Sequence, residues 1–166
     1  MKQAYKGMLE ELRRRNWKVR LRKKPTPLPD DITARYPWIP SHIREFMEET
    51  DAVESPDDKS WFLTSADFSG ESQAAFSWNQ WELDSLDAAE DDSELQAEIR
   101  SFWAEHFPIL MSVKSGYAYF AIRRQDLAIV QGEEPEYEES VDDVTDSFSE
   151  FMQMVALGDP RLERWI

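Results

Sequence analysis

The sequence predicts an α+β fold in a single domain, with a mostly antiparallel sheet that ends in a C-terminal meander and is covered by helices. Its length of 166 residues is typical of one domain. Hydrophobic residues make up 41% of the chain, and seven Trp, nine Phe and five Tyr can fill a core. Three strand-like runs separated by turn residues lie in the C-terminal half, between two stretches with helical periodicity. A disordered acidic chain is excluded, because such chains lack the apolar side chains that offset the entropy of folding.

The chain begins with a basic extension, residues 1–24. Lys2 to Asn16 favours a helix, because apolar side chains recur at helical spacing, although Gly7 weakens it. Trp17 to Arg22 alternates apolar and basic residues, which is typical of a half-buried strand at a sheet edge. Five of the nine prolines follow within residues 25–40, and they predict an extended connector that lacks regular hydrogen bonds over most of its length.

The middle of the chain is predicted to hold a helix, a loop and a strand. Ser41 is expected to cap a short helix with one apolar face. We interpret residues 51–58 as a loop and residues 61–63, Trp-Phe-Leu, as a strand, whereas the aromatic stretch 75–83 fits either a strand or a helix. The apolar face of the helix consists of Ile43, Phe46 and Met47.

A second helix and the meander follow. Ser93 can form a capping box with Gln96 and open a helix whose apolar face should pack on a sheet. This face consists of Leu95, Ile99, Phe102 and Trp103. Strand-like runs joined by turn residues then form the meander: residues 107–113, 117–123 and 127–130.

The C-terminal part is predicted to contain an acidic segment and a last helix. Gly132 is expected to end the third meander strand and to release the acidic segment. Ser147 and Glu150 form a capping box that opens a helix, and Gly158 is expected to close it. Residues 159–166 remain as a C-terminal tail. The apolar face that should cover the sheet consists of Phe148, Phe151, Met152 and Val155.

Charge is distributed unevenly along the chain, whose formal net charge is −15. Residues 1–24 hold ten Lys or Arg and two Asp or Glu, whereas residues 25–166 hold nine and 32, so a head of +8 precedes a body of −23. A basic head can bind phosphates by releasing their counterions. We favour a head that lies against its own acidic body or keeps an edge strand soluble, because a body of −23 repels nucleic acid. No nucleic-acid partner is therefore expected.

The composition disfavours several kinds of chemistry. The absence of Cys excludes disulfides, thiolate metal sites and thiol nucleophiles, and two His leave little scope for zinc or Ser-His-Asp chemistry. We interpret His106 as a helix-terminal or core-edge residue, and His42 has no visible triad partner. No apolar run is long enough for a membrane span, and the N-terminus does not match a secretory signal. We expect a cytoplasmic protein with no membrane contact and no cofactor.

Four runs follow one another in the C-terminal half: His106 to Val113, Gly116 to Ile122, Ile129 to Glu139 and Ser147 to Phe151. In this order they resemble the SUKH superfamily, the domains similar to fungal Smi/Knr cell-wall assembly regulators. Upstream, Trp38-Ile39-Pro40 is similar to the family's proline before a helix. The resemblance covers about residues 36–157, and we place the SUKH-like domain at residues 36–158. The chain departs from the family at Thr50-Asp51-Ala52, where Asn-Gly is usual.

The resemblance implies an α+β fold, no enzymatic activity shared across the family, and a role in binding proteins. Many bacterial relatives are proposed immunity proteins that block the substrate-binding surface of toxins, often nucleases, and fungal relatives act as scaffolds. The charge agrees with the first role, because an acidic body is steered toward a basic surface. We therefore expect a non-enzymatic, immunity-type inhibitor that occludes a basic toxin or effector. The alternatives are a carbohydrate-active or regulatory enzyme that uses paired carboxylates, and a scaffold in envelope signalling.

The expected partner-binding residues lie in the acidic segment after Gly132. Five carboxylates within seven residues surround a proline and an aromatic residue that can anchor a partner. A metal site is disfavoured, because cation-binding loops place Gly between their ligands, so no metal is expected. A solvated loop or edge strand is the alternative interpretation. The candidate residues are Glu133, Glu134, Glu136, Tyr137, Glu138 and Glu139.

Overall fold

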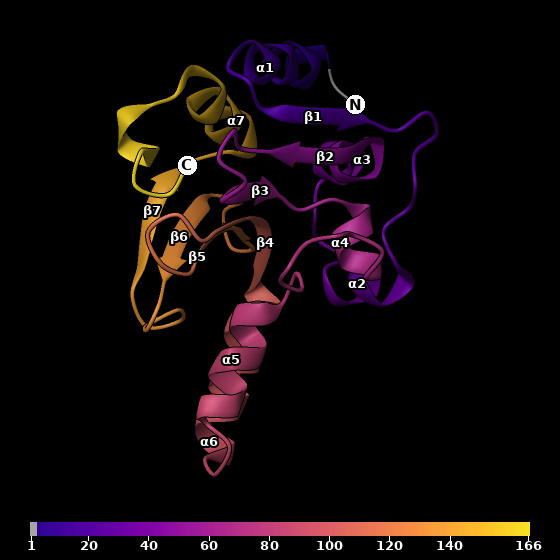
Figure 1. The fold of residues 1–166 in the computed structure, drawn as a ribbon. Coiled ribbons are helices and arrows are strands. Elements are labelled where there is room, and N and C mark those ends of the chain that lie inside the picture. Colours follow the sequence, from indigo (N-terminus) through magenta and orange to yellow (C-terminus); the bar gives the residue numbers. More distant parts are fainter. Residues whose placement is uncertain (1–2) are drawn as a thin grey trace.

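A computed structural model describes residues 3–166 and shows a seven-stranded antiparallel sheet whose strands follow one another in chain order (Figure 1). Together with the helices around it, this sheet confirms the predicted α+β class. Neighbouring strands are antiparallel throughout, so each connection returns the chain beside the strand that it leaves. The strands are β1 (Lys18–Leu21), β2 (Thr50–Glu54), β3 (Ser60–Phe62), β4 (His106–Ser112), β5 (Ala118–Arg123), β6 (Ile129–Glu133) and β7 (Val141–Thr145).

The described chain also forms seven α-helices and a short 3₁₀ helix. α1 packs on α7, and α3 packs on β2. α5 and α6 contact each other as a helical hairpin that projects beyond the sheet (Figure 1). Within residues 3–166, no helix has the length and apolar character needed to cross a membrane. The helices are α1 (Gln3–Arg14), α2 (Asp30–Arg35), α3 (Ser41–Glu49), α4 (Ser65–Ser69), α5 (Gln80–Ala88), α6 (Ser93–Glu105), α7 (Phe148–Leu157) and the 3₁₀ helix Pro160–Leu162.

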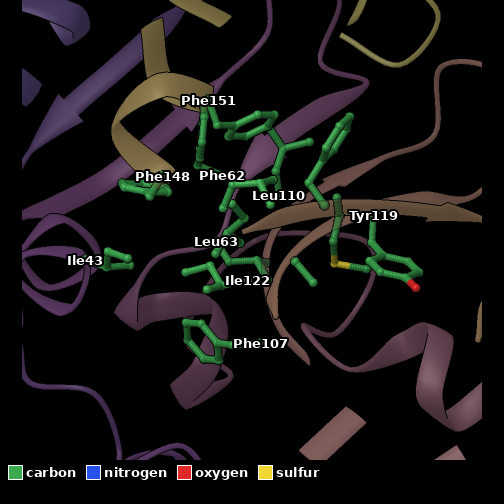
Figure 2. Packing of buried hydrophobic residues seen from close by; sticks show 14 of the residues in the cluster. Ile43, Phe62, Leu63, Phe107, Leu110, Tyr119, Ile122, Phe148 and Phe151 are labelled. Carbon is green, nitrogen blue, oxygen red and sulfur yellow. The ribbon is translucent and has the colours of Figure 1, made fainter. Parts of the chain in front are cut away.

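The core is formed by the central strands and the helices that pack on them (Figure 2). β4 and β5 are buried along almost their whole lengths, and the three strands β4, β5 and β6 confirm the predicted meander. Phe46 of α3 and Phe151 of α7 both pack against Phe62 of β3, with ring centroids 5.7 and 6.0 Å apart. Burial of such a side chain contributes roughly 1.5–3 kcal/mol, so these contacts hold both helices to the sheet.

The loop predicted for residues 51–58 is wrong over its first half, which is part of β2. β2 pairs with β1 on one side and with β3 on the other. Ala52 and Val53 are both buried, so the strand lacks the strict alternation of buried and exposed residues by which half-buried strands are predicted. The strand predicted for residues 61–63 is confirmed as β3, and the ambiguous stretch 75–83 becomes helical from Gln80 onward.

Gly132 was expected to end the third strand of the meander. This expectation is wrong, because Gly132 lies inside β6. It stands opposite Tyr119 of β5, and a Cβ on Gly132 would lie 2.4 Å from the Tyr119 hydroxyl oxygen. The missing side chain therefore lets the tyrosine ring cross the neighbouring strand. The glycine marks a close approach between side chain and backbone rather than a turn.

The predicted connector, residues 25–40, contains a helix, so the expectation of an extended chain is wrong there. α2 occupies the stretch between Pro29 and Pro37, which is free of proline. Pro29 itself is the N-cap, where the missing backbone N–H has no cost, and Ile32 is buried in the core.

Two of the three predicted helix N-caps are displaced by one residue. Pro40 is the N-cap of α3, and Ser41 is its first helical residue. Asp92 rather than Ser93 caps α6, because the Asp92 carboxylate accepts two backbone N–H groups at 3.0 and 3.1 Å. The Ser147 cap of α7 is confirmed, since its hydroxyl accepts the backbone N–H three residues on at 3.2 Å.

Residues 1–24, which the sequence set apart as an extension, join the same sheet and core in their described part. β1 pairs with β2, and three side chains of α1 are buried. Residues 159–166 also pack on the sheet, because the Trp165 carbonyl accepts hydrogen bonds from two serine hydroxyls, on β3 and β4. Lys2, the predicted start of the first helix, lies outside the described residues, and α1 begins at Gln3. The buried side chains of α1 are Tyr5, Leu9 and Leu12.

Candidate partner-binding surface

The predicted acidic segment begins at the end of β6 and leads into β7, the last strand of the sheet (Figure 1). The Glu133 carboxylate pairs with Arg164 at 2.9 Å and accepts the indole N–H of Trp165 at 3.1 Å. The Glu134 backbone N–H donates to the Tyr117 carbonyl at 2.8 Å, and its carboxylate accepts the Tyr117 N–H at 3.1 Å. These contacts fix the start of the segment between the C-terminal residues and the turn that precedes β5.

Tyr137, the expected aromatic anchor, is inside the protein. Its side chain is 6% exposed, and its ring stacks on Trp81 of α5 with centroids 5.7 Å apart and an angle of 5° between the planes. The Tyr137 carbonyl accepts the Tyr119 hydroxyl, and burial raises the pKa of the Tyr137 phenol. The ring therefore joins the segment to the core instead of presenting an aromatic surface to a partner.

Glu138 fastens the segment to two helices. One of its carboxylate oxygens accepts the indole N–H of Trp103 on α6 at 2.7 Å, and the other accepts the Ser85 hydroxyl of α5 at 3.1 Å. Partial burial raises the pKa of Glu138, and the two hydrogen bonds oppose this rise because they stabilise the charged form. The role visible in these contacts is structural.

The remaining three candidates, Glu134, Glu136 and Glu139, are exposed and form a negative surface along the segment. β7 extends this surface with the exposed Asp142, whereas the also exposed Asp143 pairs with Arg123 of β5 at 2.7 Å. The structure thus divides the six predicted residues: Glu133, Tyr137 and Glu138 hold the segment in place, Glu136 and Glu139 face solvent, and Glu134 is exposed but also bonds to Tyr117.

A second acidic element lies against this segment, and the sequence did not reveal the connection. We call it the acidic arm, residues 80–105, which comprise α5, α6 and the turn between them. The arm carries nine acidic residues and one basic residue, Arg100. It projects beyond the sheet (Figure 1), and the hydrogen bonds of Glu138 place the acidic segment at its base. Its exposed acids are Asp87, Glu90, Asp91, Asp92, Glu94, Glu98 and Glu105.

The base of the arm is held by polar contacts in the protein interior. Glu82 of α5 is 5% exposed and forms two hydrogen bonds, of 2.8 and 3.0 Å, with the Arg35 guanidinium. The Tyr36 hydroxyl donates to the Trp103 carbonyl at 2.9 Å, and the Trp81 indole N–H donates to a β5 carbonyl at 3.2 Å. A bidentate pair fixes orientation as well as distance, so these contacts set the direction of the arm.

The tip of the arm is also ordered by specific contacts. The Gln96 side-chain amide donates to the carbonyls of Ala89 and Glu90, both at 3.0 Å. Asp92 caps α6 from the same turn. These hydrogen bonds therefore fix the backbone conformation of the turn that carries the carboxylates at the tip.

Neither metal chemistry nor histidine catalysis has visible support in this region. Within residues 3–166, no group of three or more Asp, Glu or His side chains is arranged to hold a metal ion. His106 lies at the end of α6, where its Nδ1 is 2.8 Å from the Phe102 carbonyl and its ring stacks on Phe102. Burial lowers the pKa of His106, which favours the neutral ring.

Comparison with known proteins returned no match. Scans against protein-family models, curated proteins and solved structures found nothing similar to this chain. The functional argument therefore rests on the acidic arm and the segment at its base.

Proposed function

We propose that this protein is a non-enzymatic binding module that inhibits a basic protein, such as a toxin or effector, by covering its functional groove. The observation that carries the proposal is the acidic arm, with seven exposed carboxylates on a projecting helical hairpin. The exposed Glu134, Glu136 and Glu139 extend the negative surface at its base. No chemical step is required, because occlusion alone prevents a substrate from entering the groove.

Two physical properties favour such a role. Carboxylates spaced along helices imitate a row of phosphates, so they attract a surface that binds nucleic acid or another polyanion and accelerate its association. The arm is also fixed at its base by Glu82 and Glu138, so that little conformational entropy is lost when a partner binds. The antiparallel sheet with its helices agrees with the architecture that the resemblance to SUKH domains implies, and this supports a role in protein binding.

An enzyme that uses paired carboxylates gains less support. Glu138 is the candidate carboxylate whose pKa is raised, and a raised pKa suits a general acid. Its oxygens accept hydrogen bonds from Trp103 and Ser85, and these bonds stabilise the ionised form rather than the protonated form that a general acid needs.

The proposal is tested by affinity capture from host lysate with a matched pair of variants. In the arm variant, Asp87→Asn, Glu90→Gln, Asp91→Asn and Glu94→Gln remove four charges from the arm. The control variant removes four exposed charges elsewhere through Glu10→Gln, Asp31→Asn, Glu150→Gln and Glu163→Gln. Both have the same net charge, so any difference between them reports where the charge lies.

We expect the wild type and the control variant to retain one near-stoichiometric basic protein at low salt, and the arm variant to lose it. Raising the salt concentration should release the partner, because the screening length shortens to about 8 Å at 0.15 M. Equal capture by the arm variant would show that the arm is not the interface. If the purified partner kept its full activity in the complex, inhibition would be excluded.

A further inference from the structure

β7 is the last strand of the sheet, so within residues 3–166 no strand lies on its outer side (Figure 1). The direction of its backbone groups follows from the bonds between β6 and β5. The Arg123 N–H of β5 donates to the carbonyl of Ala128, the residue before β6, at 2.9 Å. Residues of a paired strand bond alternately to one side and to the other, so Val130 and Gly132 also turn their N–H and C=O groups toward β5. These two residues therefore offer no backbone bond to β7.

The outward groups of β7 belong to the residues that lie opposite these two. Val141 lies opposite Gly132, and Asp143 lies opposite Val130. Their N–H and C=O groups therefore point away from β6, and no group within residues 3–166 forms a hydrogen bond with them on that side. The register shifts after Asp143, so the regular edge spans residues 141–143. Unpaired N–H and C=O groups in a row form a template to which another strand can pair.

The other edge of the sheet is already covered in part. The Arg13 guanidinium donates to the Val19 carbonyl of β1 at 3.3 and 3.4 Å. Side chains that cover an edge hinder the addition of a further strand. Both edge strands contain a register shift, but β7 has no such side-chain cover among the described residues. β7 is therefore the more accessible edge.

The side chains along the open edge are acidic. Asp142 is exposed and forms no ion pair with the described residues, whereas Asp143 pairs with Arg123 at 2.7 Å. The exposed Glu139 precedes the strand, and the exposed Asp146 follows it. Like charges that lie opposite each other destabilise a strand pair and opposite charges stabilise it, so this edge disfavours a second copy of β7. It fits a strand that carries Lys or Arg.

We infer that β7 pairs with an extended basic segment of the protein partner, which thereby adds a strand to the sheet. Main-chain hydrogen bonds to Val141 and Asp143 provide affinity, and the acidic side chains select Lys or Arg. The inference rests on the proposed function, because it names how the basic partner is held beside the arm. The acidic segment leads from the base of the arm into β7, so one partner can contact both.

The test uses the full chain and two blocked peptides, acetyl-Lys-Val-Lys-Val-Lys-amide and its Glu counterpart. Binding is followed by the amide signals of Val141 and Asp143 in ¹H–¹⁵N NMR spectra and by their hydrogen exchange. Val141→Pro removes an outward N–H, which an edge strand tolerates, and Val141→Thr is the matched control that keeps it. Asp142→Asn removes the unpaired charge. Two analogues of the Lys peptide carry N-methyl groups, one on both valines and the other on the last two lysines.

We expect the Lys peptide to shift both amide signals in a saturable way and to slow their exchange, and the Glu peptide to have no effect. Val141→Pro should weaken binding by up to about tenfold through the loss of one hydrogen bond, and Asp142→Asn by up to about fivefold. Val141→Thr should bind as the wild type does. Because alternate residues of a strand bond to opposite sides, one N-methylated analogue should bind and the other should not. Equal effects of the two analogues, or equal binding of the Lys and Glu peptides, would overturn the inference, even if Val141→Pro did not fold.

The arm variant separates this inference from the proposed function. It should bind the Lys peptide as the wild type does, and a loss of binding would place the peptide on the arm and overturn the inference. If capture depends on the arm but the peptide does not reach β7, only the strand pairing fails. If the peptide pairs with β7 but capture does not depend on the arm, only the proposed function fails. A dimer in sedimentation, with slow exchange of the Val141 amide in the free protein, would assign the edge to a second copy and also overturn the inference.

Discussion

The two edges of the sheet carry charges of opposite sign and use them differently. On β1, Lys18 pairs with Glu54 and Arg20 pairs with Asp51, both acids belonging to the neighbouring strand β2. On β7, Asp143 pairs with Arg123 of β5 at 2.7 Å, and the exposed Asp142 continues the negative surface of the acidic segment. The basic edge is thus largely neutralised within the molecule. Asp142 and six of the seven exposed acids of the arm form no ion pair among the described residues, while the seventh, Glu105, pairs with Arg124.

This difference explains how a chain with a basic head can still act as an acidic protein. The Arg13 guanidinium donates to the Val19 carbonyl at 3.3 and 3.4 Å, so it also covers part of the outer edge of β1. Such protection discourages edge-to-edge association of strands. The expectation that the head lies against its own acidic body is borne out at Lys18 and Arg20, whose acidic partners lie on β2, whereas Arg13 contacts residues of the head itself.

The largest effect is expected from the close packing that supports the acidic edge. In Gly132→Ala, the new methyl group would overlap the Tyr119 ring, and we expect a loss of about 3 kcal/mol in the free energy of unfolding. Gly7→Ala, on the basic side, is the control, because a Cβ there meets no atom within 4 Å. It should stabilise α1 by about 0.5–1 kcal/mol. Urea denaturation measures both, and similar values for the two variants would contradict the packing argument.

A smaller loss of stability is expected when the hydrogen bonds between the acidic segment and the arm are removed. Glu138→Ala leaves the Trp103 indole N–H and the Ser85 hydroxyl without their acceptors, which should cost about 2 kcal/mol. The neighbouring exposed Glu136→Ala should change stability by less than about 0.5 kcal/mol. Thermal unfolding of both variants checks the contrast. Indistinguishable melting temperatures would mean that the hydrogen bonds of Glu138 do not hold the acidic segment to the arm.

The partial burial of Glu138 predicts a pH dependence of stability. The pKa of Glu138 is raised in the folded state, so its contribution to stability is largest at low pH and is lost as the pH rises through that pKa. When the pH is lowered from 7 to 5, the free energy of unfolding should therefore increase less in Glu138→Gln than in the wild type. Since the lowered pKa of His106 acts in the opposite sense, the readout is the difference between wild type and variant in urea titrations. Parallel pH profiles would refute this.

The smallest effect is expected at the basic edge. Lys18→Gln combined with Arg20→Gln removes two exposed ion pairs, and exposed pairs contribute about 0–1 kcal/mol each. Stability should change by less than about 1 kcal/mol, and partner capture by the arm should be unaffected. A loss of capture equal to that of the arm variant would reverse the roles that we assign to the two edges.

The candidate site was predictable in composition but not in arrangement. The carboxylates of residues 133–139 are visible in the sequence, yet Tyr137 and Glu138 turn inward because Trp81 and Trp103, more than thirty residues earlier, supply a stacking ring and a hydrogen-bond donor. The acidic arm was missed as part of the site for the same reason. Its charge run is local, but its position beside residues 133–139 depends on contacts that are distant in sequence.

The sequence by itself determined the meander, the cap and apolar face of α7, the position of β1 at an edge and the opposite charges of head and body. These features depend on the spacing of apolar residues, on turn and cap residues and on charge counts, all of which act over a few positions. Only the tertiary structure decided that Thr50–Glu54 is a strand, that Gly132 admits the Tyr119 ring, and that the arm and the acidic segment form one surface. Each of these depends on which distant side chains fill the space around a residue, and local patterns do not encode that.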